Sequence, residues 1–156
     1  GGVLALILAD GKHLASAGRD GSVRVWEIAS GKQLWSKVEH RGYVTCLAAA
    51  GQGSFYSSGR DGRILRWNVA SGLQPGEMAG AAWTDALAVT PGGSGLWAGS
   101  GATSISAFDA AGKPLPALAG HVGGINALAV SPDGKRLVSA SADGTLLVWP
   151  TAPPVQ

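Results

Sequence analysis

The sequence repeats a short signature at a fixed spacing of 41 residues. Each copy ends on an aromatic residue, and these residues are Trp26, Trp67, Phe108 and Trp149. A fixed period of this size indicates one supersecondary unit stacked on copies of itself, because such a unit cannot bury its apolar surface alone. The repeat therefore constrains the architecture before any single residue is considered.

The second repeat shows the unit most completely. Its Asp61-Gly62 pair is a strong signal for a tight hairpin between two strands. No helical period appears anywhere in the unit. The apolar and alternating segments predict four antiparallel strands, at Tyr43 to Ala49, Ser54 to Ser58, Ile64 to Val69 and Leu73 to Ala79.

Both faces of the inner strands of this unit are apolar, so each sheet needs a neighbouring sheet on either side. A β-propeller provides that cover. The composition fits many short strands with tight turns, since 46% of residues are apolar, 25 are Gly and only 14% are charged. We expect an all-β propeller with four-stranded antiparallel blades at 3–38, 43–79, 83–119 and 124–150, followed by a tail at 151–156.

These residues resemble the WD-repeat β-propellers over essentially the whole chain. The resemblance depends on Gly120-His121, the run Ser131 to Lys135, Ser139, Asp143-Gly144 and the strand-ending Trp149. The combination is specific, although Glu39-His40 departs from the Gly-His of the family and no Asp follows the Trp residues.

The resemblance implies a buried hydrogen-bonded chain of four side chains in a blade: a His before the first strand, a Ser in the second, an Asp in the next turn and the Trp. A Ser-His-Asp hydrolase site is the disfavoured alternative, because the Trp would occupy the Ser oxygen. The matching sets are His40, Ser57, Asp61 and Trp67; His121, Ser139, Asp143 and Trp149; and, without a His, Ser16, Asp20 and Trp26.

The third repeat has lost the whole set. Ala98, Ala102 and Phe108 replace Ser, Asp and Trp, and Ala81 or Ala82 stands where the His would be. A half-satisfied buried network costs more than an apolar core, so joint loss supports treating the four side chains as one unit.

Propellers of this family usually bind partners at the end where the turns after the second strands meet the starts of the first strands. By resemblance, that end presents Arg and aromatic side chains, which dominate interface energies. The alternative is that the aromatic residues cap the sheets and the Arg residues are solvated. The candidate partner-binding residues are Arg19, Tyr43, Arg60, Trp83, Asp85 and Asn126.

We therefore expect a non-catalytic scaffold that binds a protein or peptide, with acidic or phosphorylated segments favoured by the Arg residues. A net charge of +2 is too small to argue for nucleic acid or an anionic membrane, so neither is expected as a partner. No cofactor is expected, and three scattered His with one Cys, the inert Cys46, give no metal-site spacing. A cytoplasmic location and, from the Ala and Gly richness, a bacterial source are favoured.

Two other functions stay open. The segment from Val25 to Trp35 resembles the repeat of quinone-dependent dehydrogenase propellers, but it occurs once. Alternatively, the blades support a catalytic or signalling domain encoded upstream.

The expected strands number fifteen, because proline disfavours a strand after Trp149 and the last blade then lacks its outer strand. Seven blades are common in the family, so the chain is expected to be the C-terminal part of an incomplete seven-bladed ring. Self-association of two copies through open edges toward eight blades is the alternative.

Overall fold

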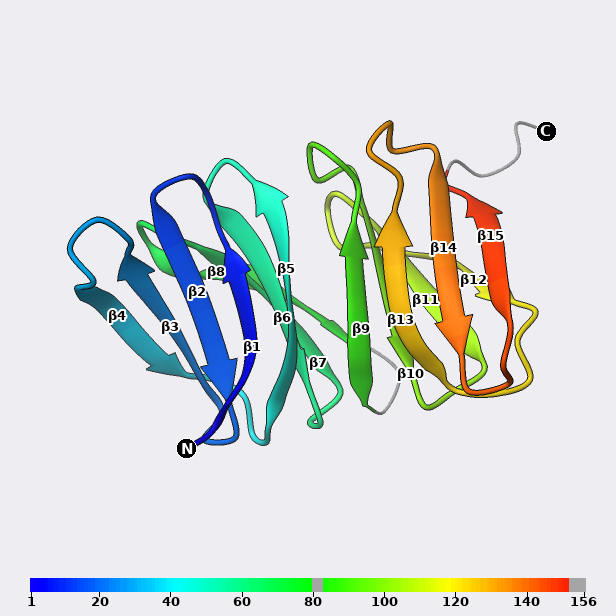
Figure 1. Cartoon of the computed structure of the whole chain (residues 1–156), viewed down its shortest axis with the longest axis horizontal. Helices are drawn as coiled ribbons and strands as arrows, with labels where there is room; N and C mark the ends of the chain where they lie inside the picture. The colour runs from blue at the N-terminus through cyan, green and yellow to red at the C-terminus, as the bar shows by residue number, and fades with distance from the viewer. Residues whose placement is uncertain (80–82, 152–156) are drawn as a thin grey trace.

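The computed structural model describes residues 1–79 and 83–151 and shows fifteen strands and no helix there (Figure 1). The described residues accordingly contain no long apolar helix that could cross a membrane. The expected His position at Ala81 or Ala82 and most of the tail lie outside this range. The strands are β1 (Val3–Leu8), β2 (His13–Gly18), β3 (Ser22–Glu27), β4 (Gln33–Val38), β5 (Val44–Gly51), β6 (Ser54–Gly59), β7 (Arg63–Asn68), β8 (Gly72–Ala79), β9 (Thr84–Val89), β10 (Gly95–Ser100), β11 (Ser104–Asp109), β12 (Pro114–Ala119), β13 (Ile125–Val130), β14 (Arg136–Ser141) and β15 (Leu146–Pro150).

The strands form four antiparallel sheets, and within each sheet every strand pairs with the next along the chain. Sheets one to three contain β1–β4, β5–β8 and β9–β12, and the fourth contains β13–β15 in the described residues. The first strands β1, β5, β9 and β13 lie side by side, so the sheets stack in chain order (Figure 1). The expected all-β fold of antiparallel blades is confirmed, and the last blade shows three strands in the described residues.

The core consists of three apolar layers, one between each pair of successive sheets. Val25 of the first sheet and Phe55 of the second share one layer. Ile64 of the second and Leu87 of the third share the next, and Ile105 of the third and Ile125 of the fourth share the last. Each inner sheet is therefore buried on both faces, which explains its apolar residues on both sides of the strands.

The outer faces of the first and fourth sheets lack such cover. Strand residues alternate between faces, so Ile7 packs on the first core layer while Leu6 and Leu8 point away and are 60% and 64% exposed. On β15, Leu146 and Val148 are likewise exposed. The described sheets thus end on two open apolar flanks.

Candidate binding site

The second blade holds a continuous chain of buried polar side chains. The Trp67 indole N–H donates to Ser57 Oγ at 2.7 Å, and Ser57 Oγ lies 2.7 Å from His40 Nε2. His40 Nδ1 lies 3.0 Å from both carboxylate oxygens of Asp61. The four side chains come from β7, β6, the segment before β5 and the turn after β6, so the chain ties four segments of the blade together.

The donors and acceptors of this network balance when His40 is neutral. Its Nδ1–H then donates to Asp61, and its Nε2 accepts the Ser57 hydroxyl. Burial lowers the pKa of His40, against the opposing effect of Asp61. Burial alone would raise the pKa of Asp61, but the Arg41 backbone N–H and His40 bond its carboxylate and lower it overall.

The fourth blade repeats the geometry. Trp149 Nε1–H donates to Ser139 Oγ at 2.8 Å, and Ser139 Oγ lies 2.8 Å from His121 Nε2. His121 Nδ1 lies 2.9 Å from Asp143 Oδ2. A fifth member, Thr145, donates its hydroxyl to Asp143 at 2.6 Å, and this bond is the first cause of the low pKa of Asp143.

The first blade has only part of the network. Trp26 Nε1–H donates to Ser16 Oγ at 2.9 Å, but no His bonds Asp20 in the described residues. Asp20 instead accepts from Arg24 Nη2 at 2.7 Å and from the Ser22 hydroxyl at 2.5 Å, and both bonds lower its pKa. A salt bridge on a half-exposed turn thus takes the place of the buried His.

The third blade replaces the network with apolar packing. Ala98 and Phe108 are buried in the core layer shared with the second blade. Trp97 is buried on the other face, in the layer shared with the fourth blade. Ala102 lies exposed in the turn.

These networks support the turns and leave no accessible nucleophile. Ser57 is fully buried, and its oxygen already bonds both Trp67 and His40. A substrate has no approach to that oxygen, so the Ser-His-Asp arrangement of the second blade cannot work as a hydrolase site.

Four of the candidate partner-binding residues lie next to one another at one end of the sheets. The Arg19 guanidinium lies 5.9 Å from the ring centre of Tyr43, and the Arg60 guanidinium 5.6 Å from the same ring. Arg60 also lies 5.4 Å from the ring of Trp83. We call Arg19, Tyr43, Arg60 and Trp83 the Arg–aromatic ladder, because Arg and aromatic residues alternate along it within cation–π distance.

Local backbone contacts position the ladder. The Arg60 N–H donates to the Tyr43 carbonyl at 2.9 Å, which fixes the turn after β6 beside the start of β5. A Cβ on Gly59 would collide with that carbonyl, so only glycine permits this approach. The Arg19 N–H makes the equivalent bond to Gly2 at 3.0 Å.

The remaining candidates, Asp85 and Asn126, lie at β-bulges. In the pairing of the first and second strands, each blade skips the second residue of its first strand, and both Asp85 and Asn126 are skipped in this way. Bulges redirect side chains, and both residues are exposed. Neither forms a hydrogen bond or ion pair with the ladder in the described residues. The equivalent residues of the first two blades are Leu4 and Thr45.

Two open depressions flank the ladder. One, of about 320 Å³, includes Arg19, Arg41 and Tyr43 in its lining. The other, of about 310 Å³, is lined by Trp83, Ser100, Gly101 and Ala102. Both volumes are at the lower end of the range of small-ligand pockets, and each suits one or two side chains of an extended peptide.

Trp35 and Cys46 lie in packed regions outside the ladder. Trp35 donates its indole N–H to the Val69 carbonyl at 2.7 Å and stacks on Trp67, which joins the first two blades. Cys46 is partly rather than fully buried, and burial raises the pKa of its thiol. The described residues contain no group of three or more His, Cys, Asp or Glu that could hold a metal ion.

Neither the bulges nor the placement of Arg66, a partly buried charged residue beside a core layer, was predicted from the sequence. The bulges leave no signal in a single sequence, because they change strand pairing and not residue type. Arg66 was detectable, since the 41-residue period aligns it with Val25, Ala107 and Val148.

Stacked antiparallel sheets with Trp-Ser-His-Asp chains inside individual blades define a repeat protein of the β-propeller class. The sequence pattern of the WD40 family, described as "WD domain, G-beta repeat", matches residues 1–27, 31–68 and 112–150. Because the match covers more than half of the chain, this protein belongs to the WD40 family. The unmatched stretch includes most of the third blade, where the network is lost.

Several known proteins are similar to this chain. Nuclear distribution protein nudF of Aspergillus niger is 26% identical over 140 residues, which cover 90% of this chain and 27% of nudF. Human WD repeat-containing protein 86 is 54% identical over 41 residues, 26% of this chain and 11% of that protein. The solved structure of the computationally designed Ika4 protein has a TM-score of 0.87 at 25% identity and covers 97% of this chain and 92% of its own.

The chain spans only about a quarter of the length of nudF. These relatives are fungal and human, which gives no support to a bacterial source.

Proposed function

We propose that this WD40 chain is a protein-interaction scaffold whose Arg–aromatic ladder binds an acidic or phosphorylated peptide segment. WD40 membership supports the scaffold role at the level of the family. The observation that carries the finer proposal is the alternation of Arg19, Tyr43, Arg60 and Trp83 at cation–π distances on an exposed surface.

The charge of the ladder favours an anionic partner. Arg19 and Arg60 form no ion pair in the described residues, whereas the nearby Asp20 is paired with Arg24 at 2.7 Å. Both guanidinium groups therefore keep N–H donors for carboxylate or phosphate oxygens. Contact with the rings restricts the two Arg side chains in advance, which lowers the entropy cost of ordering them on binding.

The ladder also has the apolar surface that a peptide anchor needs. Tyr43 and Trp83 are 42% and 54% exposed, and they stand beside the two depressions. Aromatic and Arg residues are the types that most often dominate binding energy. An extended segment with an acidic group over Arg60 and apolar side chains in the depressions would use all four residues.

The test is Arg60→Ala, with Arg136→Ala as the matched control on the exposed face of β14. An array carrying matched unmodified, Glu-substituted and phosphorylated peptides identifies ligands of the wild-type chain, and fluorescence anisotropy then measures their affinities. We expect Arg60→Ala to weaken binding by at least about 1 kcal/mol, roughly fivefold in Kd, and to leave unfolding unchanged.

The control should bind like wild type. Equal affinity of wild type and Arg60→Ala for the selected peptides would reject the ladder as the binding site. Equal binding of the unmodified and phosphorylated peptides would instead reject the preference for an anionic group.

A further inference from the structure

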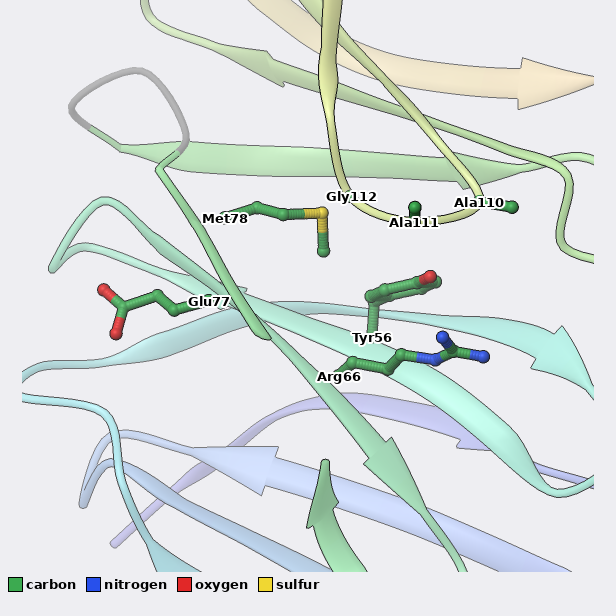
Figure 2. Close-up of a pocket in the computed structure, with 7 residues that line it drawn as sticks. All are labelled: Tyr56, Arg66, Glu77, Met78, Ala110, Ala111 and Gly112. Atoms are coloured by element: carbon green, nitrogen blue, oxygen red, sulfur yellow. The ribbon is translucent and has the colours of Figure 1, made fainter. Parts of the chain in front are cut away.

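A second site, independent of the ladder, lies between the second and third blades. Two cavities of about 60 and 130 Å³ adjoin there, and Tyr56 and Arg66 line both. Figure 2 shows the smaller cavity, with Tyr56 and Arg66 beneath the Ala110–Gly112 turn of the third blade.

Arg66 is a charged residue in a position that other repeats make apolar. The repeat period aligns it with Val25 and Ala107, both buried in core layers. Its neighbours on the same face of the sheet, Tyr56 and Ile64, belong to the layer that packs on the third blade. Arg66 therefore places a charged, partly buried side chain beside an apolar core layer.

That guanidinium has no counter-charge in the described residues. Its Nε is buried without a hydrogen-bond partner there, and its Cζ lies 6.0 Å from the ring centre of Tyr56. Glu77 also lines the smaller cavity, but its carboxylate is bonded to Arg63 Nη2 at 2.8 Å and points away from Arg66 (Figure 2). An unpaired buried donor on a cation is costly, so the site favours an anion.

The walls of the site are backbone turns with little room to spare. A Cβ on Gly112 would approach the Met78 Cγ and Sδ to 3.2 Å, and one on Gly93 would approach the Ala50 carbonyl to 3.0 Å. Two turns of the third blade thus close on the second blade around Arg66. The cavities are well below the volume of a drug-sized pocket, which restricts the ligand to a single small group.

We propose that Arg66, together with Tyr56, forms an inter-blade site for a small oxyanion, a phosphate or a carboxylate group. The guanidinium supplies charge-assisted donors, including the otherwise unpaired Nε–H. The Tyr56 ring holds the guanidinium in place. An anion bound there would also link the second blade to the glycine turns of the third.

Nuclear magnetic resonance of the ¹⁵N-labelled chain tests this site, with inorganic phosphate and, separately, acetate titrated at constant ionic strength against chloride. We expect saturable shifts of the Arg66 Nε–H signal and of the Gly93 and Gly112 amides. Arg66→Met should weaken the apparent affinity reported by the glycine amides at least tenfold. Arg136→Met, an exposed arginine in another blade, should leave it unchanged.

The two anions distinguish the chemistry: saturation by phosphate alone assigns a phosphate group, and saturation by both assigns a general oxyanion site. Shifts that do not saturate, or that persist in Arg66→Met, would overturn the proposal. If Arg66→Met does not fold, the wild-type titration decides, because an unmoved Nε–H signal would show that water alone fills the cavities. Arg60→Ala should retain the shifts, so the experiment tests the Arg66 site independently of the proposed peptide site on the ladder.

Discussion

At the scale of single residues, Ser57 and Ser139 are the points where the polar networks converge. Each Ser oxygen accepts an indole N–H from one strand and bonds a His from the chain before the blade. Because these groups are buried, removing one member leaves its partner without water or protein to bond. A buried network therefore depends on all of its members, in agreement with their joint loss from the third blade. In the first blade, where no His bonds Asp20 in the described residues, Arg24 and Ser22 bond its carboxylate instead.

Asp61→Ala should lower the free energy of unfolding by about 2 kcal/mol, since it leaves the buried His40 Nδ1–H without its acceptor. Asp20→Ala is the matched control, because Asp20 occupies the same turn position but bonds Arg24 and Ser22 at a half-exposed site. We expect that control to lose less than about 1 kcal/mol. Urea unfolding followed by circular dichroism measures both, and equal losses would contradict a special role for the buried His.

The stability of the chain should fall on acidification, in part through His40. Burial lowers the pKa of His40 in the folded state, so the unfolded chain binds a proton first as the pH falls. This contribution is fully present above the ordinary His pKa of about 6.5 and is lost as the pH falls toward the lowered value. The lowered pKa of Asp61 acts in the same direction at more acidic pH.

His40→Gln should therefore show a shallower loss of unfolding free energy between about pH 7 and about pH 5 than the wild type. Urea titrations at several pH values in this range measure the two slopes. Parallel slopes would mean that His40 does not titrate differently in the folded and unfolded states.

At the scale of elements, the sequence predicted strands well because alternation and Asp-Gly turns are local signals. In the second blade, the expected segments at Ser54 to Ser58 and Ile64 to Val69 correspond to β6 and β7 to within one residue at each end. The bulges at Thr45, Asp85 and Asn126 were not predictable, because a bulge depends on how two strands pair.

The third blade shows the same limit. Its loss of polar residues was readable from Ala98, Ala102 and Phe108. The sequence did not show which neighbouring blade each residue faces. Ala98 and Phe108 pack toward the second blade, whereas Trp97 packs toward the fourth. Which face of a sheet meets which neighbour is a property of the stack.

At the scale of the whole molecule, the two open flanks are the apolar surfaces of the stack that no described sheet covers. Leu6 and Leu8 on β1, and Leu146 and Val148 on β15, are each at least 59% exposed. Contiguous apolar surface of this kind usually marks an interface. We propose that further blades cover these flanks, supplied either by a longer protein as a seven-bladed ring or by a second copy of this chain.

The isolated 156-residue chain should consequently self-associate, as size-exclusion chromatography with light scattering can measure directly. A double variant, Leu6→Lys with Val148→Lys, places a charge on each flank and should shift the chain toward the monomer. Substituting the exposed Lys113 by Gln, in the turn between β11 and β12 of the third blade, is the control and should leave the mass unchanged. A monodisperse wild-type monomer would reject self-association through these faces.

The sequence alone determined the period, the strands, the propeller class and the members of the polar networks, because each of these leaves a local pattern that repeats every 41 residues. The tertiary structure decided the distances along the Arg–aromatic ladder, the positions of the bulges and the placement of Arg66 beside two turns of the next blade. Those features join residues from different blades, and contacts between blades depend on how sheets stack, which no pattern within one repeat contains.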